Sequence, residues 1–375
     1  MRILHCLRAP VGGLFRHVLD LAAEQARLGH DVGILADSNA EDRLTSPKFA
    51  SVATQLKLGI LRTPMSRNPG LGDLQAYRTV LAHARALDLD VLHGHGAKGG
   101  AYARLAVRAL NRQPNRSAHP VKSFYTPHGG SLNFKPGTAE AKLFLGLERI
   151  LERYSTGLIF ESAYAARVYS ERVRKPAVAL RVIPNGLRKA DFDLATPAKN
   201  ATDVLFVGEL RAIKGIDVLI DALAALNADS KVTATIVGAG PDSDALIAKV
   251  AARGLSNVIT FTGALPARDA FALGRIMVVP SLAESFPYVV LEAAAAGLPL
   301  ISTNVGGIPE IVAGTDTDLI PPSDCVVLTS AIREALKNPA AAAAKASRLR
   351  ANIERKFTVE GMTRAVLDFY AVSNR

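Results

Sequence analysis

The sequence predicts an α/β protein with two doubly wound, Rossmann-like domains facing a cleft. First, short apolar strands alternate with loops and helices along the whole chain, which is typical of parallel sheets covered by helices. Second, this rhythm breaks in a polar stretch between Ile183 and Asp203 and then restarts. Third, residues 1–190 carry 28 Lys+Arg and 14 Asp+Glu (+14), whereas residues 191–375 carry 17 and 20 (−3). A single eight-fold barrel is the less favoured alternative because of this break.

Each expected strand is a short apolar run that leads into a loop and a helix. In the first half these runs are residues 3–7, 32–36, 91–93, 123–125 and 158–160. In the second half they are residues 204–207, 232–237, 258–261, 276–279 and 298–302. Residues 338–350 are rich in alanine and predict a surface helix. The domains are therefore expected at residues 1–185 and 186–357.

Composition excludes several classes of protein. The two cysteines, Cys6 and Cys325, have neither disulfide-framework nor zinc-ligand spacing. The apolar start is too short for a secretory signal, and no run has the length of a membrane span, so the expected compartment is the cytoplasm. The basic first half suits nucleic acid, a phosphorylated acceptor or an anionic membrane, or is a solvated face. Nucleic acid is disfavoured because basic residues form no dense run and do not interleave with aromatics.

Two carboxylates stand eight positions apart around the start of a predicted helix. Glu284 follows the strand at residues 276–279, and Glu292 lies inside the helix that ends at Gly297. A helix N-terminus at the carboxyl end of a parallel strand favours an anion, while carboxylates accept hydrogen bonds from sugar hydroxyls. A nucleotide-sugar has both groups. The alternative is one acid favoured by the helix dipole and one solvated acid.

Two further loops lie at the carboxyl ends of predicted strands. Gly12 and Gly13 follow the first strand and allow backbone close to a ligand, although a tight turn is the favoured explanation of the two glycines taken alone. In the second half, Gly208 is followed by Arg211 and Lys214 on the strand-to-helix loop. These two cations can clamp a diphosphate, or they are solvated loop residues.

Three histidines lie near strand ends in the first half. His93, His95 and His128 make a metal site conceivable, but no acid or cysteine stands at ligand spacing, so metal is disfavoured. A cleft role is favoured for His128, which lies in a Pro-His-Gly-Gly turn. Four Asp-x-Asp pairs fall outside the expected strand ends and are interpreted as turn or surface acids.

Taken together, the motifs resemble the retaining glycosyltransferases of family 4, which have the two-domain GT-B architecture. The most specific part is the acid, seven residues, acid pattern from Glu284 to Glu292. Weaker parts are residues 182–186, 208–215, 236–241 and 305–310. There are departures: many members have Arg where Glu209 stands, and Gly where Ser285 and Pro287 stand.

The resemblance implies a role for each candidate. Glu292 would bind the donor ribose and Glu284 the donor sugar. Lys214 and Arg211 would stabilise the leaving diphosphate, and His128 would lie beside the reacting sugar. The remaining donor-binding candidates are backbone positions: Gly12, Gly13, Gly208, Phe286, Val289 and Val290. In such proteins the first domain binds the acceptor, the second binds the donor, and the last helix, here within residues 358–375, crosses back onto the first.

The resemblance implies transfer of a sugar, with retention, from a nucleotide diphosphate-sugar to a lipid-linked or saccharide hydroxyl in polysaccharide or glycolipid synthesis. It implies no cofactor and no metal. The segments at residues 93–100 and 125–129 resemble a bacterial subgroup that builds polysaccharides on lipid carriers. A sugar phosphorylase or sugar-nucleotide epimerase, a silent nucleotide-sugar sensor and a nucleic-acid binder remain the alternatives.

One helix has a composition that suits a membrane surface. Leu143, Phe144, Leu147, Ile150 and Leu151 form an apolar stripe, with Lys142, Arg149 and Arg153 close by. Such a helix can make peripheral contact with an anionic bilayer at its inner, cytoplasmic face. Packing of the stripe against the core is the favoured interpretation.

Overall fold

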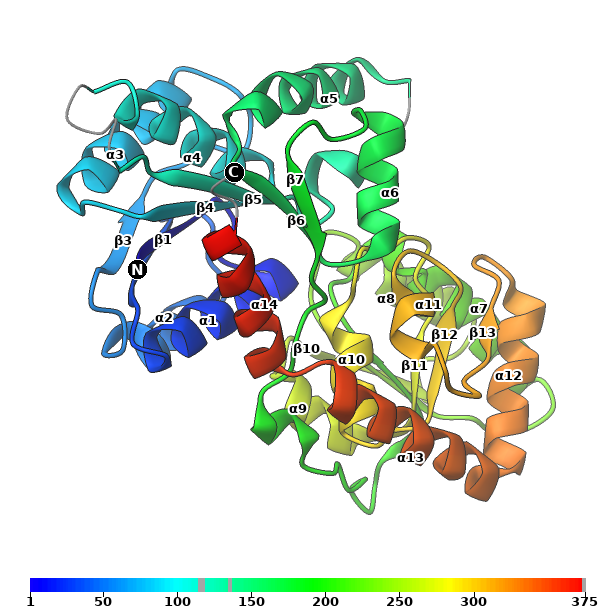
Figure 1. The fold of residues 1–375 in the computed structure, drawn as a ribbon. Coiled ribbons are helices and arrows are strands. Elements are labelled where there is room, and N and C mark those ends of the chain that lie inside the picture. The colour runs from blue at the N-terminus through cyan, green and yellow to red at the C-terminus, as the bar shows by residue number, and fades with distance from the viewer. Residues whose placement is uncertain (114–118, 134–136, 373–375) are drawn as a thin grey trace. The chain divides into compact units, whose positions relative to one another are not determined.

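The computed structural model describes residues 1–113, 119–133 and 137–372 and divides the chain into two units (Figure 1). Unit 1 comprises Met1–Gly186 and Val359–Arg375, and unit 2 comprises Leu187–Thr358. These boundaries lie one residue from those expected from the sequence. Each unit is built on a parallel sheet, so the prediction of two doubly wound domains is confirmed.

The sheet of unit 1 has seven described parallel strands in the order β3-β2-β1-β4-β5-β6-β7. Their bounds are β1 Arg2–Leu7, β2 Asp31–Asp37, β3 Gly59–Thr63, β4 Val91–His95, β5 Lys122–Thr126, β6 Gly157–Phe160 and β7 Ala179–Val182. The central strands are apolar on both sides because helices cover both faces. Since all strands run in parallel, their carboxyl ends share one edge of the sheet.

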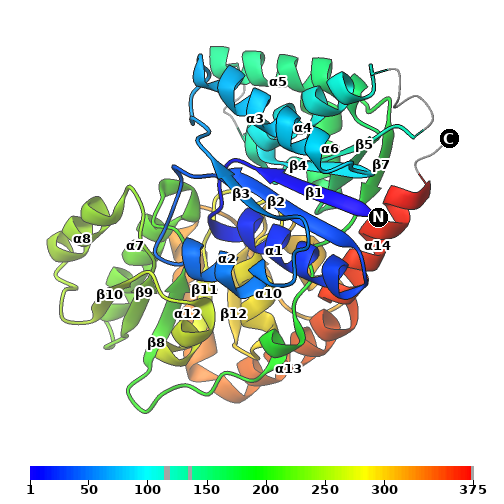
Figure 2. The same ribbon diagram turned by 90° about the vertical axis from the view of Figure 1, so that its left-hand side faces the viewer.

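Helices from both ends of the chain cover the first face of this sheet (Figure 2). They are α1 Gly12–Arg27, α2 Thr45–Ala53 and α14 Val359–Val372. In α14, Val366, Phe369 and Tyr370 pack on Ile3 and Phe124, and the Tyr370 and Phe124 ring centroids are 4.5 Å apart. The final helix is therefore part of the hydrophobic core of unit 1.

The opposite face is covered by the helices between β3 and β7 (Figure 2). They are α3 Gly72–Ala86, α4 Gly96–Leu110, α5 Ala139–Leu151 and α6 Ala163–Arg172, with the 3₁₀ turns η2 Gly130–Asn133 and η3 Glu152–Tyr154. Leu4, Cys6 and Leu92 pack against α3 and α4 on this face. Within the described residues, no helix combines the length and the apolar character needed to cross a bilayer.

The sheet of unit 2 has six parallel strands in the order β10-β9-β8-β11-β12-β13. Their bounds are β8 Thr202–Val207, β9 Ala234–Val237, β10 Ile259–Gly263, β11 Gly274–Val279, β12 Leu300–Thr303 and β13 Leu319–Ile320. Helices α7 Ile216–Asn227, α8 Ser243–Ala252 and α12 Cys325–Lys337 pack on the face that presents Val204 and Val278.

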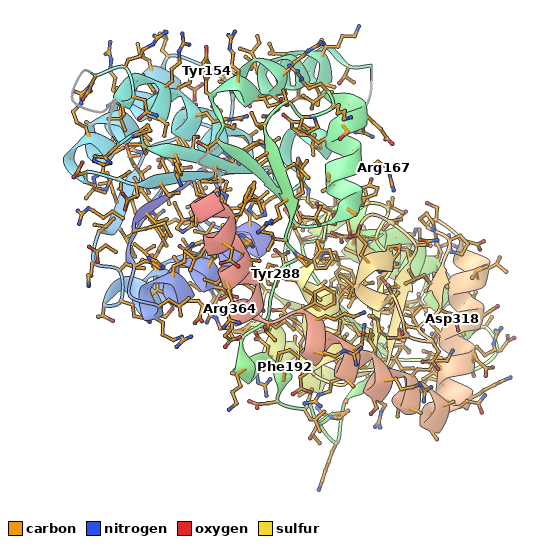
Figure 3. The ribbon with its side chains drawn as sticks, in the orientation of Figure 1. Tyr154, Arg167, Phe192, Tyr288, Asp318 and Arg364 are labelled. Carbon is orange, nitrogen blue, oxygen red and sulfur yellow. The ribbon has the colours of Figure 1, made fainter. Side chains whose placement is uncertain are left out.

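The other face of this sheet is covered by shorter elements and one long helix. They are α9 Ala267–Ala270, α10 Tyr288–Ala295, α11 Ile308–Val312 and α13 Pro339–Lys356, with the 3₁₀ turns η4 Lys189–Phe192 and η6 Phe271–Leu273. Phe192 and Tyr288, labelled in Figure 3, belong to the cluster beneath them. Helix α13 is mostly exposed, as expected, and buries Leu349 and Ile353 in the same cluster. A further 3₁₀ turn, η5 Ala212–Lys214, lies in the connection between β8 and α7.

Candidate active site

In unit 2, the candidate site contains an ion pair between two strand-to-helix loops. The Lys214 ammonium lies 2.6 Å from Glu284 Oε1, and the Ser281 hydroxyl donates to the same oxygen at 2.7 Å. The Lys214 side chain is 22% exposed and that of Glu284 9%. The structure thus brings two of the predicted residues together, one after β8 and the other after β11.

Close backbone packing holds these loops in place. Gly215 has a left-handed φ of 65°, and a Cβ there would lie 2.1 Å from the Pro280 carbonyl oxygen. Gly306 has a φ of 60°, and its Cβ would lie 1.8 Å from the Glu284 carbonyl oxygen. Only glycine fits at such positions. The loop after β12 therefore presses on the Glu284 backbone, and the Lys214 loop is fitted against β11.

Helix α10 follows this pair and has Pro287 as its N-cap residue. Pro287 has no N–H, so the first amides of the helix that can meet an anion belong to Tyr288, Val289 and Val290. Phe286 is 4% exposed and packs on Phe357, which leaves its backbone as the part that a ligand can meet. Glu292 is half-buried on the same helix.

Two other predicted residues of this unit, Gly208 and Arg211, lie on the same strand-to-helix loop as Lys214. Arg211 is exposed, and its guanidinium lies 3.6 Å from the Glu209 carboxylate. Glu209 stands at the position where many of the proteins that the motifs resemble have arginine. Gly208 directly follows β8, and the next turn is fixed by the Ala212 N–H, which donates to Asp242 at 2.6 Å. Arg211 thus lies on the predicted loop after β8, but its ion-pair partner is Glu209, two positions before it in the sequence.

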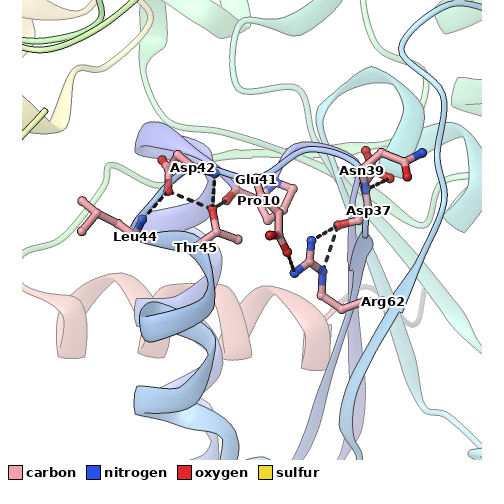
Figure 4. A network of polar contacts seen from close by, with 8 residues as sticks. All are labelled: Pro10, Asp37, Asn39, Glu41, Asp42, Leu44, Thr45 and Arg62. Atoms are coloured by element: carbon pink, nitrogen blue, oxygen red, sulfur yellow. Dashed lines mark hydrogen bonds and ion pairs between the residues drawn. The ribbon is translucent and has the colours of Figure 1, made fainter. Parts of the chain in front are cut away.

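In unit 1, Gly12 and Gly13 are exposed at the start of α1. Gly12 has a left-handed φ of 65°, and a Cβ there would meet nothing within 4 Å. The loop before them is held by the Thr45 hydroxyl, which lies 3.1 Å from the Pro10 carbonyl oxygen (Figure 4). The same close-up shows Arg62 donating to the Asp37 carbonyl at 2.7 and 3.0 Å. The Thr45 contact fixes the chain next to the two glycines, and the Arg62 contacts join the carboxyl ends of β2 and β3.

Five histidines converge at the carboxyl edge of the first sheet. They lie on β1, α1, β4 and the turn after β5, namely His5, His17, His93, His95 and His128. The sequence analysis missed His5 and His17, because they are far from the others in sequence and lie within apolar segments. It placed His93 near a strand end, whereas His93 is buried within β4 and bonded to Thr126 and Tyr370.

Three of these histidines form a hydrogen-bonded chain. The Gln25 carbonyl oxygen lies 2.8 Å from His5 Nε2, and a carbonyl only accepts, so this nitrogen carries the proton. His5 Nδ1 then accepts from His95 Nε2 at 3.0 Å, and His95 Nδ1 accepts from His128 Nε2 at 3.0 Å. His128 Nδ1 is left as an acceptor, suited to a ligand hydroxyl. Gln25 thereby sets the tautomer of His128.

Burial keeps this cluster neutral. It lowers the pKa of His5 and of His17 to about 4. Burial, followed by repulsion from neighbouring rings, holds the pKa of His93, His95 and His128 well below its usual range. His128 also has a left-handed φ of 51°, which is uncommon for a residue with a side chain. A strained, half-buried histidine at the end of a chain of neutral rings is suited to orienting a ligand.

The cluster also satisfies the geometric requirement for metal ligation. His5, His93 and His95 form one group, and His17, His95 and His128 another, with the ligand atoms of each group within 4.8 Å of one another. His17 Nε2 is buried and has no partner among the described residues. The sequence argument against metal relied on missing acids and cysteines and did not foresee a set made of histidines alone.

A cavity of about 280 Å³ opens beside His128 and His95. Its other lining residues come mainly from the loops after β1 and β3, the start of α4 and the start of α5: Arg8, Ala9, Leu14, Arg67, Asn68, Pro69, Gly96, Ala97, Lys98, Pro127, Gly130, Glu140 and Phe144. This cavity lies within unit 1. The charged residues that line it are the cations Arg8, Arg67 and Lys98 and one carboxylate, Glu140.

Comparison with known proteins identifies the class. The "Glycosyltransferase Family 4" model matches residues 11–190 and the "Glycosyl transferases group 1" model residues 201–338. Glycogen synthase of Mycobacterium tuberculosis is 28% identical over 97% of this chain and 92% of its own length. D-inositol 3-phosphate glycosyltransferase of Streptomyces avermitilis is 32% identical over 88% and 77%.

The fold agrees with solved structures. HepE of Anabaena in complex with UDP-glucose has a TM-score of 0.79 at 21% identity, covering 99% of both chains. Two parallel α/β domains of this kind are the GT-B architecture of glycosyltransferases. The matches over both units show, further, that this chain belongs to glycosyltransferase family 4.

Proposed function

We propose that this glycosyltransferase uses a nucleotide diphosphate-sugar and transfers the sugar, with retention of anomeric configuration, to a lipid-linked or saccharide hydroxyl. The observation that carries the proposal is the Lys214–Glu284 pair at 2.6 Å, on loops that precede α7 and α10. A cation beside a helix N-terminus suits a leaving diphosphate, and a carboxylate suits sugar hydroxyls.

Each candidate residue takes a role in this proposal. Glu292 binds the ribose, Glu284 the donor sugar, and Lys214 with Arg211 the diphosphate. The amides near Phe286, Val289 and Val290, and the close backbone at Gly208, complete the donor site in unit 2. In unit 1, His128 orients a sugar hydroxyl through Nδ1, and Gly12 and Gly13 allow a ligand to approach the backbone.

We further propose that the reaction needs no metal, that unit 1 binds the acceptor, and that the enzyme works in the cytoplasm at the inner face of the membrane. A role in polysaccharide or glycolipid synthesis fits a lipid-linked acceptor. Charge stabilisation by Lys214 replaces the metal in this scheme. The exposed side of α5 supports the membrane contact, as described below.

The decisive experiment is a thermal-shift screen against UDP, GDP, ADP and their sugars, since a bound ligand raises the apparent stability by about 2.7 kcal/mol at 100 times its Kd. UDP and UDP-glucose come first because HepE was solved with them. Turnover is then followed by nucleoside diphosphate release, and the anomeric configuration by NMR of the product. No stabilisation by any nucleotide, or inversion at the anomeric carbon, would refute the respective parts of the proposal.

A further inference from the structure

Helix α5 carries an exposed apolar stripe as well as a buried face. Its buried positions include Glu148, whose carboxylate lies 2.8 Å from the Arg104 guanidinium and accepts from the Tyr125 hydroxyl at 2.6 Å. Three of its outward positions are large and apolar: Leu143 is 54% exposed, Leu147 41% and Ile150 50%. The charged residues Lys142 and Arg149 are also exposed. The interpretation that this stripe packs on the core is therefore wrong for these three residues. A soluble helix normally buries its apolar face, so an outward stripe marks a binding surface.

The first turns of the same helix border the cationic cavity. Glu140 and Phe144 line it, and Phe144 is a helical-surface neighbour (i, i+3) of Leu147 in the exposed stripe. The cavity and the stripe are thus continuous along α5. A ligand held in the cavity has an apolar surface immediately beside it.

The charges of the cavity favour an anion. Arg8 and Arg67 line it, and neither makes an ion pair or hydrogen bond with other residues in the described parts of the chain. The N-terminus of the 15-residue helix α4 contributes Gly96 and Ala97, and its N-cap residue His95 provides no side-chain cap. Lys98 adds a third cation, which is paired with Asp73 at 2.6 Å. Guanidinium groups and free helix amides are the usual partners of phosphate.

The cavity also discriminates between kinds of phosphate ligand. Glu140 is the one carboxylate among its described lining residues, and it repels a bare anion but accepts a hydrogen bond from a hydroxyl. His128 Nδ1 is an acceptor as well. At about 280 Å³, the cavity is near the lower limit of ligand sites, so it has room for a headgroup and none for a long hydrocarbon chain.

We propose that the acceptor is a phosphorylated lipid. Its phosphate binds Arg8, Arg67 and the start of α4, its hydroxyl-bearing headgroup faces Glu140 and His128, and its hydrocarbon chain lies along Leu143, Leu147 and Ile150. This inference rests on the proposed function, because it names the acceptor class of that reaction. It goes further in assigning both a phosphate site and a hydrocarbon site to named residues.

The test uses three simple probes and calorimetry on the full chain. Octyl phosphate has both features, ethyl phosphate has only the phosphate, and octyl glucoside has only the chain on an uncharged head. We expect octyl phosphate to bind at least tenfold more tightly than either of the others. Equal affinity for ethyl and octyl phosphate would point to a soluble phosphate ligand and overturn the lipid assignment. Equal affinity for octyl phosphate and octyl glucoside would overturn the phosphate site.

Two variants and one control locate the sites. Arg8→Gln with Arg67→Gln should weaken both phosphates at least tenfold. Leu143→Ser with Leu147→Ser and Ile150→Ser should weaken octyl phosphate alone and leave ethyl phosphate unchanged. The control, Arg78→Gln with Arg112→Gln, removes the same charge from exposed arginines that do not line the cavity. If the control weakens binding as much as the cavity variant, the attraction is non-specific and the proposal fails.

Nucleotide-sugar binding, measured on the same preparations, separates this inference from the proposed function. If nucleotide-sugar binding is intact and octyl phosphate does not bind, the lipid inference fails and the proposed function stands. If no nucleotide-sugar binds, the proposed function fails, and with it the assignment of a phosphorylated lipid as acceptor.

Discussion

Lys214 and Glu284 are 70 positions apart in sequence, yet their charged groups lie 2.6 Å apart. The Ser281 hydroxyl bonds the same carboxylate oxygen, so contacts within the protein orient Glu284. A cation fixed in this way needs little rearrangement when a diphosphate leaves.

Replacing Lys214 with Ala should lower kcat at least tenfold and change the acceptor KM little, because the missing charge matters most as the diphosphate departs. Steady-state kinetics at saturating donor measures this. The matched control is Lys249→Ala, which breaks the comparable ion pair with Asp221 at 2.8 Å on the helical face of the same unit. If Lys214→Ala and Lys249→Ala have the same kcat, Lys214 is only a structural cation.

Replacing Glu292 with Gln should weaken nucleoside diphosphate binding at least tenfold. A hydrogen bond to a charged group contributes about 1.5–3 kcal/mol, and the amide keeps the size but loses the charge. Isothermal calorimetry measures the Kd, and Glu354→Gln on the exposed face of α13 serves as the control. An unchanged Kd would show that Glu292 does not contact the nucleotide.

Activity should survive excess EDTA, because the proposed charge stabilisation comes from Lys214 and the helix N-terminus. The assay is product formation before and after chelation, together with metal analysis of the purified protein. Loss of activity that manganese or magnesium restores would contradict the prediction. Zinc retained by the histidine cluster in an EDTA-resistant, active enzyme would instead assign the metal a structural role.

Acidification should destabilise unit 1 selectively. The pKa of His5 and of His17 falls to about 4 on folding, so their neutral forms stabilise the protein fully above about pH 6.5, and this stability is lost as the pH falls toward 4. Each histidine contributes a loss of about 1.4 kcal/mol per pH unit in that window.

Hydrogen exchange at pH 7.5 and pH 5, corrected for intrinsic rates, measures this loss for each unit separately. Residues 187–358 contain no histidine, so unit 2 serves as the internal control. Equal destabilisation of both units would show that the histidine cluster is not responsible.

Vesicles containing acidic lipid should bind the protein, and neutral vesicles should bind it weakly. Reversing the exposed charges of Lys142, Arg149 and Arg153 to Glu should reduce this binding and leave nucleotide affinity intact. Binding should also weaken with salt, since exposed charges are screened beyond about 10 Å at 0.1 M. Sedimentation with vesicles measures all three effects. Indifference to lipid charge would mean that the basic residues of α5 are merely solvated.

The sequence was sufficient to predict the two sheets, but of their edge strands it predicted only β10. The three strands absent from the prediction, β3, β7 and β13, each lie at the edge of a sheet. Edge strands are buried less than central ones, and β7, Ala-Leu-Arg-Val, is largely exposed, so no continuous apolar run identifies it. The central strands were found because burial on both faces requires such a run.

The candidate site was predictable where it depends on short motifs. Glu284, Lys214 and His128 could be placed because the loops that follow parallel strands lie at the carboxyl edge of their own sheet. For Glu284 and Lys214 this is the sheet of unit 2, and for His128 the sheet of unit 1. The histidine chain was not predictable, since Gln25, His5 and His95 lie on three separate elements and meet only through the strand order β1-β4. The exposure of Leu143 was missed because the apolar residues of a helix have the same spacing whether their stripe faces the core or the solvent.

The position of α14 has a consequence for biosynthesis. Tyr370 completes the core of unit 1 and donates to His93 at 2.6 Å, but it is translated after the whole of unit 2. A ribosome therefore delivers all of residues 187–358 before the amino-terminal unit has its final helix. Domains usually fold in order of synthesis. Here the later unit can finish first, and the nascent amino-terminal sheet must wait, with Phe124 and Ile3 uncovered by α14, until that helix has been translated.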